Sequence, residues 1–371
     1  MIRIDDLINC YSAPVIGNLN CGPKNLISDV SGVTVGHCTI SSDDSKTIRT
    51  GVTVIKPSDA RDLFANKVPA AVSVINGFGK SYGLVQLEEL GVLETPIALT
   101  NTFSVPEIAT AQIKSAIEVN AEIGRSLPTV NPLVLECNDG YLNDIQSFAV
   151  KEEHYLKALS DCSSTFEQGA VGAGHGMKCF GFKGGVGSAS RISVCSNSYI
   201  VGSLVLSNFG ALTNLRIGGL ELGELLESKN LNIQLEKFEQ VKAEDEDKGS
   251  IIMVLATDAP LDSRQLKRLS LRAAAGLART GSNFGHGSGD ISVAFSTAYS
   301  VEQSNNQVLN KSIATLNEGQ INYLFDAAAE ATEQAIINSL WHSKTTYGRD
   351  GHVCRNLFDV IKERFFDMES K

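Results

Sequence analysis

The sequence predicts a layered α/β or α+β protein, and three observations support this prediction. Short apolar runs rich in β-branched residues recur along the chain, helical patterns lie between and after them, and the two kinds of segment alternate irregularly. The helical patterns are rich in alanine, which lets a helix approach a sheet closely. We find no internal repeat, so the layers are expected to form from different segments rather than from copies of one unit.

The predicted strands are short runs with little charge and many Val and Ile residues. Such runs fit a pleated surface that is buried on at least one side. Six of them stand out: GVTVI (51–55), AAVSVI (70–75), PLVLE (132–136), YIVGSLVL (199–206), SIIMVLAT (250–257) and DISVAFST (290–297).

Two helices are expected in the first three quarters of the chain. Residues 106–125 place isoleucines and an alanine on one face, with a proline near the first turn, where it costs no hydrogen bond. The second follows Asp262 and Gln265, which are spaced as a capping box, and we expect it to run to Gly281.

Two more helices are expected near the C-terminus. Asn317-x-x-Gln320 opens a segment whose apolar residues hold a 3.6-residue period over about six turns, to Leu340. A final helix is expected from Asn356 to Met368.

Composition limits the classes of function. The chain has 371 residues, 43% of them hydrophobic and 20% charged, which is typical of a soluble globular protein with ample length for a core. The formal net charge of −10 argues against nucleic acid and anionic membrane surfaces as main partners. We see no signal-peptide pattern and no stretch near the ~20 apolar residues of a membrane span, and we expect a cytoplasmic location.

The eight cysteines include no C-x-x-C pair, so neither a zinc ribbon nor a thioredoxin motif is indicated. A chain of this length needs no disulfide framework, and we expect reduced thiols. The six histidines are scattered without metal-ligand spacing, and H-E-x-x-H is absent. A single histidine is more often structural than catalytic; His286 is noted as an exception because it lies in the segment FGHGSGD. No metal and no organic cofactor are expected.

A glycine-rich stretch, GAVGAGHGMKCFGFKGGVGS, occupies 169–188. It matches neither the P-loop nor the dinucleotide fingerprint, so nucleotide binding is only weakly supported. Glycines also mark places where the backbone turns or packs closely, and we favour that reading, with possible contact to an active site. G-x-S-x-G is absent too, which disfavours an α/β-hydrolase.

The most informative step is Gly249–Ser250. An acidic, polar segment at 228–249 is expected to be a mobile linker, and it runs directly into the predicted strand 250–257. This context suits a self-cleaving nucleophile: the Ser250 hydroxyl attacks the Gly249 carbonyl, and water then splits the ester. Glycine before the serine is expected to tolerate the strained backbone of that attack.

Cleavage would give Ser250 a free α-amine, whose pKa of about 7.7–8.0 suits a general base near neutral pH. No histidine is then needed. The alternative is that an ordinary acidic loop enters a strand, which is common.

Many separate motifs, in order through most of the chain, resemble one family: the serine peptidases that include L-aminopeptidase D-Ala-esterase/amidases and β-peptidyl aminopeptidases, also called the DmpA family. The motifs are SGVTVGH (31–37), RTGVTVI (49–55), NGFGKSYGL (76–84), LTNTFSV (99–105), LECNDGYLND (135–144), GAVGAGHGMKCFGFKGGVGSASR (169–191), SNFG (207–210), GSIIMVLATDAPL (249–261), GHGSGDISVAFST (285–297) and GRDGH (348–352).

The resemblance implies self-cleavage between Gly249 and Ser250, into chains 1–249 and 250–371 that stay associated. It implies that Asn208 is the oxyanion-hole residue. Ser288 and Asp290 match the pair that hydrogen-bonds near the nucleophile and tunes its amine and hydroxyl.

The same resemblance assigns the substrate pocket. Glu136 matches the acid that holds the substrate's ammonium group, and Tyr141 would line the same pocket. Each residue also has an ordinary structural alternative: a turn for Asn208, element ends for Ser288 and Asp290, and a surface ion pair for Glu136.

The fold implied for residues 1–371 is a single αββα sandwich, similar to the N-terminal nucleophile hydrolases but with different connectivity. The implied activity is removal of the N-terminal residue from short peptides, amides or esters, by a homo-oligomer, with a tetramer expected. Preference among L-α, D- and β-amino acids stays open. Two alternatives remain: an ornithine acetyltransferase-like enzyme on the same layers, and a non-catalytic protein that holds a small anionic ligand in 169–188.

Overall fold

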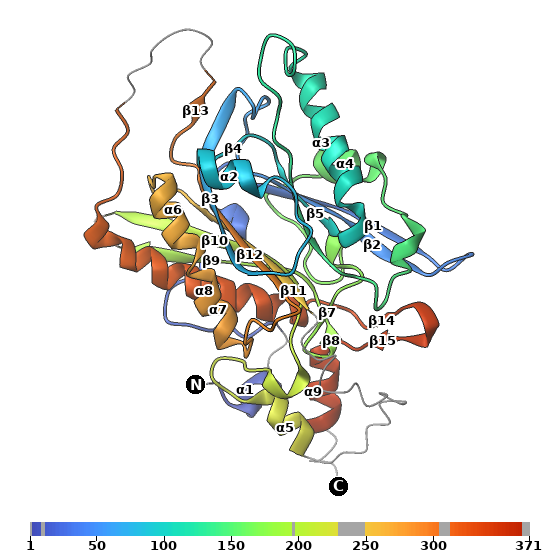
Figure 1. Ribbon diagram of the computed structural model, residues 1–371. Helices are drawn as coiled ribbons and strands as arrows, with labels where there is room; N and C mark the ends of the chain where they lie inside the picture. The colour runs from blue at the N-terminus through green and yellow to red at the C-terminus, as the bar shows by residue number, and fades with distance from the viewer. Residues whose placement is uncertain (1, 9–11, 195–196, 229–248, 304–311, 366–371) are drawn as a thin grey trace.

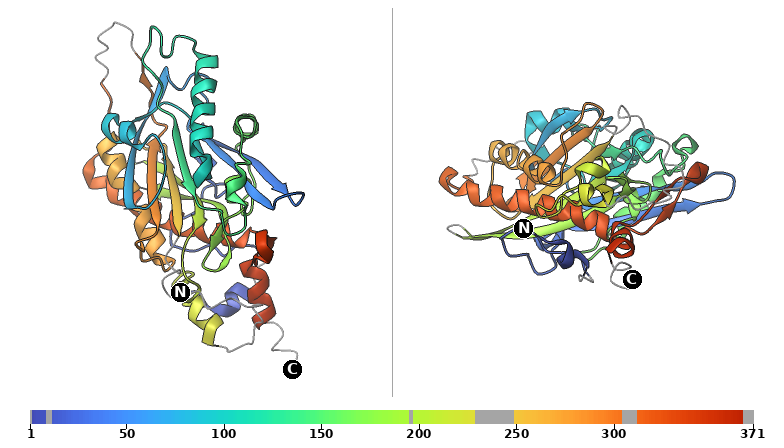
Figure 2. Two further views of the ribbon diagram at one scale, coloured as in Figure 1. Left: turned by 45° about the vertical axis from the view of Figure 1, so that its right-hand side comes forward. Right: turned by 90° about the horizontal axis from the view of Figure 1, so that it is seen from below.

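Two β-sheets lie face to face between two layers of helices in the computed structural model (Figures 1 and 2). The structure describes residues 2–8, 12–194, 197–228, 249–303 and 312–365. The order of layers is α, β, β, α, which confirms the layered fold expected above.

The smaller sheet has four strands in the order β1-β2-β5-β6. Helices α3 and α4 cover its outer face, and Ile108 and Ala158 from these helices lie in one apolar cluster with Val54 of the sheet. The elements are β1 (Thr34–Ser42), β2 (Ile48–Lys56), β5 (Ile97–Asn101), β6 (Leu133–Cys137), α3 (Val105–Val119) and α4 (Glu152–Ser160).

The larger sheet has seven strands and carries helices on its other face. Its order is β13-β3-β12-β11-β10-β9, with β4 paired to β3, and β11 and β12 run parallel. The strands are β13 (Val301–Glu302), β3 (Asn66–Gly77), β12 (Gly289–Ser296), β11 (Ser250–Thr257), β10 (Ser198–Asn208), β9 (Gly185–Val194) and β4 (Val92–Leu93); the helices are α6 (Ser263–Ser270), α7 (Ala273–Arg279) and α8 (Ile321–Trp341).

Strand β11 lies at the centre of this sheet and shows how two cores form. Alternate residues of a strand point to opposite faces. Ile252 and Val254 pack into the core between the sheets, while Ile251 and Met253 pack into the core beneath the helices. All eight residues of β11 are buried, so its continuous apolar sequence reflects burial on both faces.

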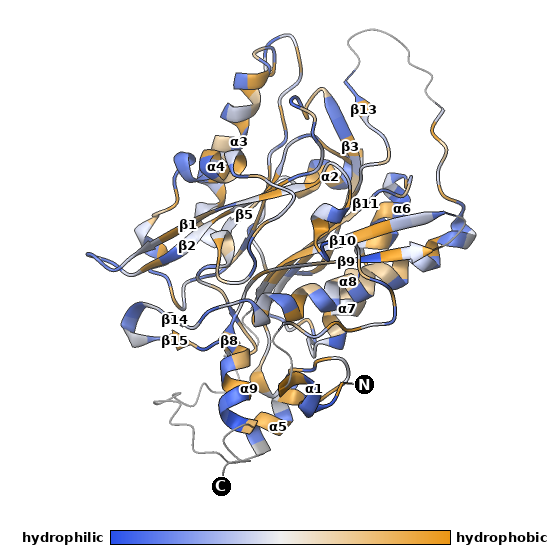
Figure 3. Cartoon of the chain, turned by 180° about the vertical axis from the view of Figure 1, so that it is seen from behind, coloured by the Kyte–Doolittle hydropathy of each residue, from blue (hydrophilic) through white to orange (hydrophobic). Residues whose placement is uncertain are grey.

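The remaining elements lie around the sandwich, with α1, α5 and α9 grouped at one end (Figure 1). Hydrophobic residues concentrate on the central strands and on the inner sides of the helices (Figure 3). These elements are α1 (Ile4–Ile8), α2 (Leu84–Leu90), α5 (Leu222–Ser228), α9 (Leu357–Phe365), β7 (Lys178–Cys179), β8 (Phe182–Lys183), β14 (Thr346–Tyr347) and β15 (Val353–Cys354).

Seven short 3₁₀ turns complete the described elements: Ile27–Asp29, Thr102–Ser104, Ile145–Ser147, Gly172–Gly174, Leu212–Asn214, Glu318–Gln320 and Arg349–Gly351.

All six predicted strands are present, and the helix from Ile321 ends at Trp341, close to the prediction. Helix α3 stops at Val119 rather than near 125, because the chain turns at Asn120, whose side chain donates to Asp62 at 2.9 Å. The capping box at Asp262 is confirmed, but the helix that follows breaks at 271–272 into α6 and α7. Of the predicted linker at 228–249, residues 229–248 lie outside the described residues, as does the end of the last helix after 365.

The glycine-rich stretch packs closely against backbone, as predicted, and its residues 185–188 begin strand β9. A Cβ at Gly187 would lie 1.9 Å from the Ala335 carbonyl of α8, and one at Gly174 would lie 2.5 Å from the Val186 nitrogen. These positions require glycine because helix and sheet meet there without side chains between them.

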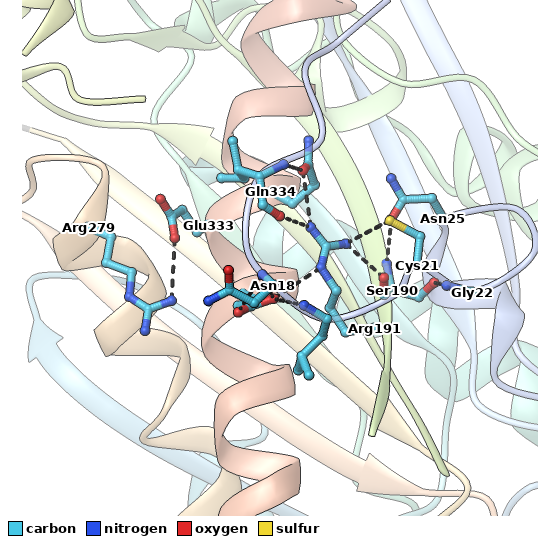
Figure 4. A network of polar contacts seen from close by, with 12 residues as sticks. Asn18, Cys21, Gly22, Asn25, Ser190, Arg191, Arg279, Glu333 and Gln334 are labelled. Carbon is cyan, nitrogen blue, oxygen red and sulfur yellow. Dashed lines mark hydrogen bonds and ion pairs between the residues drawn. The ribbon is translucent and has the colours of Figure 1, made fainter. Parts of the chain in front are cut away.

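A buried arginine ties the segment after residue 12 to β9 and α8 (Figure 4). Arg191 is fully buried and donates to the Ile16 carbonyl at 2.6 Å and to Gln334 at 3.1 Å. Its Nε lies 3.6 Å from Glu330, which also accepts from the Asn18 nitrogen at 3.0 Å. The charge is therefore compensated, which a buried arginine requires.

Candidate active site

Ser250 is the first residue of β11 and lies buried between two neighbouring strand ends. Its register partners are Asn208, the last residue of the antiparallel strand β10, and Gly289, the first residue of the parallel strand β12. The pairing therefore brings together three predicted site segments that are distant in sequence.

One backbone N–H contacts both groups that would react. The Gly289 nitrogen donates to the Gly249 carbonyl oxygen at 3.1 Å and lies 3.3 Å from Ser250 Oγ. A donor on the carbonyl oxygen stabilises the negative charge that develops there when a nucleophile attacks. A Cβ at residue 289 would lie 3.2 Å from Ser250 Oγ, so glycine keeps this approach open.

Gly249 packs closely against the end of β10, which is a second reason for glycine beside its predicted tolerance of a strained backbone during the attack. Its backbone does not adopt a positive φ. A Cβ at this position would lie 2.6 Å from the Phe209 Cα and 2.8 Å from the Asn208 carbonyl oxygen. Close packing against the end of β10 excludes any side chain.

Ser288 and Asp290 flank Gly289, and both are buried. The Ser288 hydroxyl donates to Asp290 in a short hydrogen bond of 2.6 Å. The pair therefore lies directly beside the residue that contacts Ser250.

Asn76 on β3 fixes the loop before this pair and was not identified from the sequence. Its side-chain amide donates to the carbonyls of Ser288 at 2.5 Å, Gly285 at 2.7 Å and His286 at 3.3 Å. It lies in the NGFGKSYGL motif, which was the only available signal. His286 is exposed, and its ring lies 6.4 Å from that of Phe78.

The side chain of Asn208 is oriented by two backbone groups. Its Oδ1 accepts from the Lys178 nitrogen at 2.9 Å, and its Nδ2 donates to the Asn138 carbonyl at 3.1 Å. Since the amide carries two hydrogens, one remains for an oxyanion. Neither neighbour could be identified from the sequence, because each contributes only main-chain atoms.

Glu136 lies near the end of β6 and is 3% exposed. Its Oε1 accepts from the Lys80 nitrogen at 2.8 Å, and its Oε2 accepts from the Thr102 hydroxyl. A Cβ at Gly79 would lie 3.5 Å from this carboxylate and 4.0 Å from the Gly289 Cα. Both the carboxylate and Gly289, the residue that contacts Ser250, therefore lie close to Gly79, which has no side chain.

Tyr141 lies on the Asn208 side of the site. Lys178, whose nitrogen holds Asn208, places its ammonium 4.3 Å from the centre of the Tyr141 ring. Partial burial raises the pKa of the phenol above its ordinary value, so the hydroxyl stays protonated at neutral pH and remains a donor.

Two buried ionisable groups hold the loops behind Asn208. Burial raises the pKa of Asp139 to about 7 and lowers the pKa of Lys183 to about 7. Asp139 accepts from Asn143 at 3.0 Å, and the Lys183 ammonium donates to three carbonyls, among them that of Met177 at 2.9 Å. Neither group contacts Ser250 in the described hydrogen bonds. Both hold loops that lie near the site, through their bonds to Asn143 and to the Met177 carbonyl.

Within the described ranges, no group of three or more His, Cys, Asp or Glu side chains could hold a metal ion. The cysteines of those ranges, such as Cys137 and Cys179, are free thiols, and Cys10 and Cys195 lie outside the ranges. The helices described include none long and apolar enough to cross a membrane.

Comparison with known proteins gives a consistent result. The model of peptidase family S58 matches residues 25–354. The chain is 40% identical over 349 residues to the β-peptidyl aminopeptidase BapA of Sphingosinicella microcystinivorans, covering 91% of this chain and 86% of that protein.

Two solved structures are also similar. The PH0078 protein of Pyrococcus horikoshii OT3 has a TM-score of 0.86 and 45% identity, with 96% of this chain and 98% of the other covered. The L-aminopeptidase D-Ala-esterase/amidase of Ochrobactrum anthropi, described as a variant among the Ntn hydrolase fold, has a TM-score of 0.84 and 30% identity, with 99% of each chain covered.

Proposed function

The chain belongs to peptidase family S58 and is a hydrolase of the aminopeptidase type, and we propose that it acts through Ser250 after cutting itself at Gly249–Ser250. Its proposed substrates are short peptides, amino acid amides or esters with a free N-terminal amine. The observation that carries the proposal is the contact of the Gly289 N–H with both Ser250 Oγ and the Gly249 carbonyl.

Self-cleavage begins with attack of Ser250 Oγ on the carbonyl carbon of Gly249. The C–N bond to Ser250 breaks, the nitrogen takes up the hydroxyl proton, and an ester joins the two residues. Water then attacks the ester, the C–Oγ bond breaks and Oγ regains a proton. The Gly289 N–H stabilises the oxyanion in this reaction, since it already binds the carbonyl oxygen at 3.1 Å. The proposed products are residues 1–249 and 250–371.

The new N-terminus supplies the general base for peptide hydrolysis. A free α-amine has a pKa of about 7.7–8.0, so it is partly unprotonated near neutral pH and can take the Ser250 proton. Ser288 and Asp290 tune the amine and hydroxyl from the adjacent strand, where their short hydrogen bond fixes both side chains.

The substrate binds between two polar groups. Glu136 holds the ammonium of the substrate's free N-terminus, and its two existing hydrogen bonds keep the carboxyl group oriented. Asn208 donates its remaining N–H to the oxyanion of the acyl-transfer step. Such a donor contributes about 3–4 kcal/mol in the transition state.

Hydrolysis of aminoacyl p-nitroanilides tests this function. We expect turnover of substrates with a free amine, no turnover of their N-acetyl counterparts, and none by Ser250→Ala. A panel with α- and β-amino acids measures the preference, which the β-peptidyl aminopeptidase and the L-aminopeptidase among the relatives leave open. Acetyl transfer to ornithine in place of hydrolysis would contradict the proposal.

We further propose a cytoplasmic homo-oligomer, with a tetramer as the expected form. The free thiols of the described ranges support a reducing compartment. Light scattering after size-exclusion chromatography measures the mass, and a monomer would contradict this part.

A further inference from the structure

The GRDGH motif at 348–352 lies far from Ser250 in sequence and forms a turn between β14 and β15. This turn packs on the loop after β6 that carries Tyr141. Three consecutive carbonyls of that loop each accept a hydrogen bond from it. Arg349 Nε donates to Gly140 at 2.7 Å, His352 Nδ1 lies 2.7 Å from the Tyr141 carbonyl oxygen, and the Arg349 nitrogen donates to Leu142 at 2.9 Å.

His352 holds Tyr141 in two ways. Its ring stacks on the phenol with centres 4.3 Å apart and planes 5° apart, and its Nδ1 meets the carbonyl of the same residue. A carbonyl oxygen only accepts, so Nδ1 must carry a hydrogen. The backbone contact thereby fixes the form and orientation of the imidazole that covers the ring.

The second face of the Tyr141 ring is also occupied. The imidazole covers one face, which leaves the other for the Lys178 ammonium, 4.3 Å from the ring centre. A cation over an aromatic face is attracted by the ring's quadrupole. With both faces covered, Tyr141 offers a substrate its edge and its hydroxyl, not a stacking surface.

We propose that His352 is a positioning residue for Tyr141, which it holds so that the phenol hydroxyl binds the substrate beside Asn208. The inference rests on the proposed aminopeptidase activity. Since His352 lies after residue 250 and Tyr141 before it, the contact also joins the two proposed product chains across the cut.

A double-mutant cycle tests the proposal in the full-length chain. We expect His352→Ala to lower kcat/KM about tenfold in the wild-type background and less than twofold in Tyr141→Phe, because the hydroxyl that it positions is then gone. A loss that is equally large in Tyr141→Phe would overturn the proposal, since His352 would then act elsewhere.

Two further substitutions separate the contacts of His352. His352→Asn keeps a donor near the Tyr141 carbonyl, and His352→Phe keeps the stacked ring, so each should retain more activity than His352→Ala. The matched control is His154→Ala on α4, where Nδ1 also makes a backbone hydrogen bond, at 2.8 Å, but away from the site. It should leave kcat/KM unchanged, and a loss in His352→Ala no larger than in this control would overturn the proposal.

A measurement that does not depend on enzyme activity tests the contact of His352 with Tyr141 separately from the proposed aminopeptidase function. The ring ¹⁵N shifts of histidine-labelled protein at alkaline pH should show His352 with its hydrogen on Nδ1, identified by comparison with His352→Asn. A hydrogen on Nε2 would overturn the proposed positioning of Tyr141 by His352, even in an active enzyme. An inactive wild type with Nδ1–H would instead refute the aminopeptidase function and leave the contact standing.

Discussion

Replacing Glu136 with glutamine separates substrate binding from self-cleavage. Glu136 is 3% exposed, with one oxygen bound to the Lys80 nitrogen at 2.8 Å and the other to the Thr102 hydroxyl. Glutamine has nearly the same shape. Its carbonyl can keep the bond from Lys80, and its amide can donate to Thr102, whose hydroxyl also accepts. The fold should therefore tolerate Glu136→Gln with little loss of stability.

The loss in binding follows from the missing charge. A hydrogen bond to a charged group contributes about 1.5–3 kcal/mol, and each ~1.4 kcal/mol is a factor of ten. We therefore expect KM for a free-amine aminoacyl p-nitroanilide to rise by roughly 10- to 150-fold. The ammonium is present in both ground and transition state, so kcat should change little.

Self-cleavage involves no substrate ammonium, so Glu136→Gln should be cut as fully as the wild type. The matched control is Glu333→Gln, a similarly buried glutamate on α8 that pairs with Arg279 at 3.4 Å, and its KM should equal that of the wild type. A KM for Glu136→Gln within twofold of wild type, or an uncut precursor, would refute the assigned role.

Three further predictions address the groups around Ser250. Asn208→Ala should lower kcat, expressed per mole of cleaved enzyme, by a factor of roughly 10²–10³. Asn208→Asp should lower kcat further, because it places an oxygen against the Asn138 carbonyl. Equal kcat values for both variants and the wild type would contradict the oxyanion assignment. Asn76→Ala removes the donor to three carbonyls of the loop at 285–288, so cleavage should slow in a time course of intact mass. For Asp139, burial raises the folded pKa to about 7 from 3.8, so its stabilising contribution is complete below pH 3.8 and disappears as pH rises through 7. Asp139→Asn should remove a decline in unfolding free energy of up to ~1.4 kcal/mol per pH unit between these values, measured by urea titration; an unchanged slope would contradict this assignment.

The sequence predicted the central strands well because burial on both faces leaves a continuous apolar pattern, as in 250–257. It predicted helix ends less well. Asn120 ends α3 through a hydrogen bond to Asp62, a contact with a distant segment that no local pattern contains. Strand β9 was hidden because its glycines weaken a strand signal; they are selected by close contacts, of Gly187 with α8 and of Gly185 with Gly169.

Some residues of the candidate site could be predicted from the sequence and others could not, for the same reason. Ser250 and its glycine could be recognised from their context, and the other assigned side chains from motifs. Asn76, Thr102 and His352 lie in motifs too, but their roles could not be predicted, because these consist of hydrogen bonds to main chain or to another side chain across the fold. The close packing of Gly249 against Phe209 could not be predicted either, because it depends on a segment distant in sequence.

The central claim is that the chain cuts itself before Ser250. Intact-mass spectrometry of the purified protein measures this directly. We predict two polypeptides whose masses correspond to residues 1–249 and 250–371 of the 371-residue sequence, and a single uncut, inactive chain for Ser250→Ala. An active wild-type protein that remains one chain, or one cut at another bond, would contradict the account.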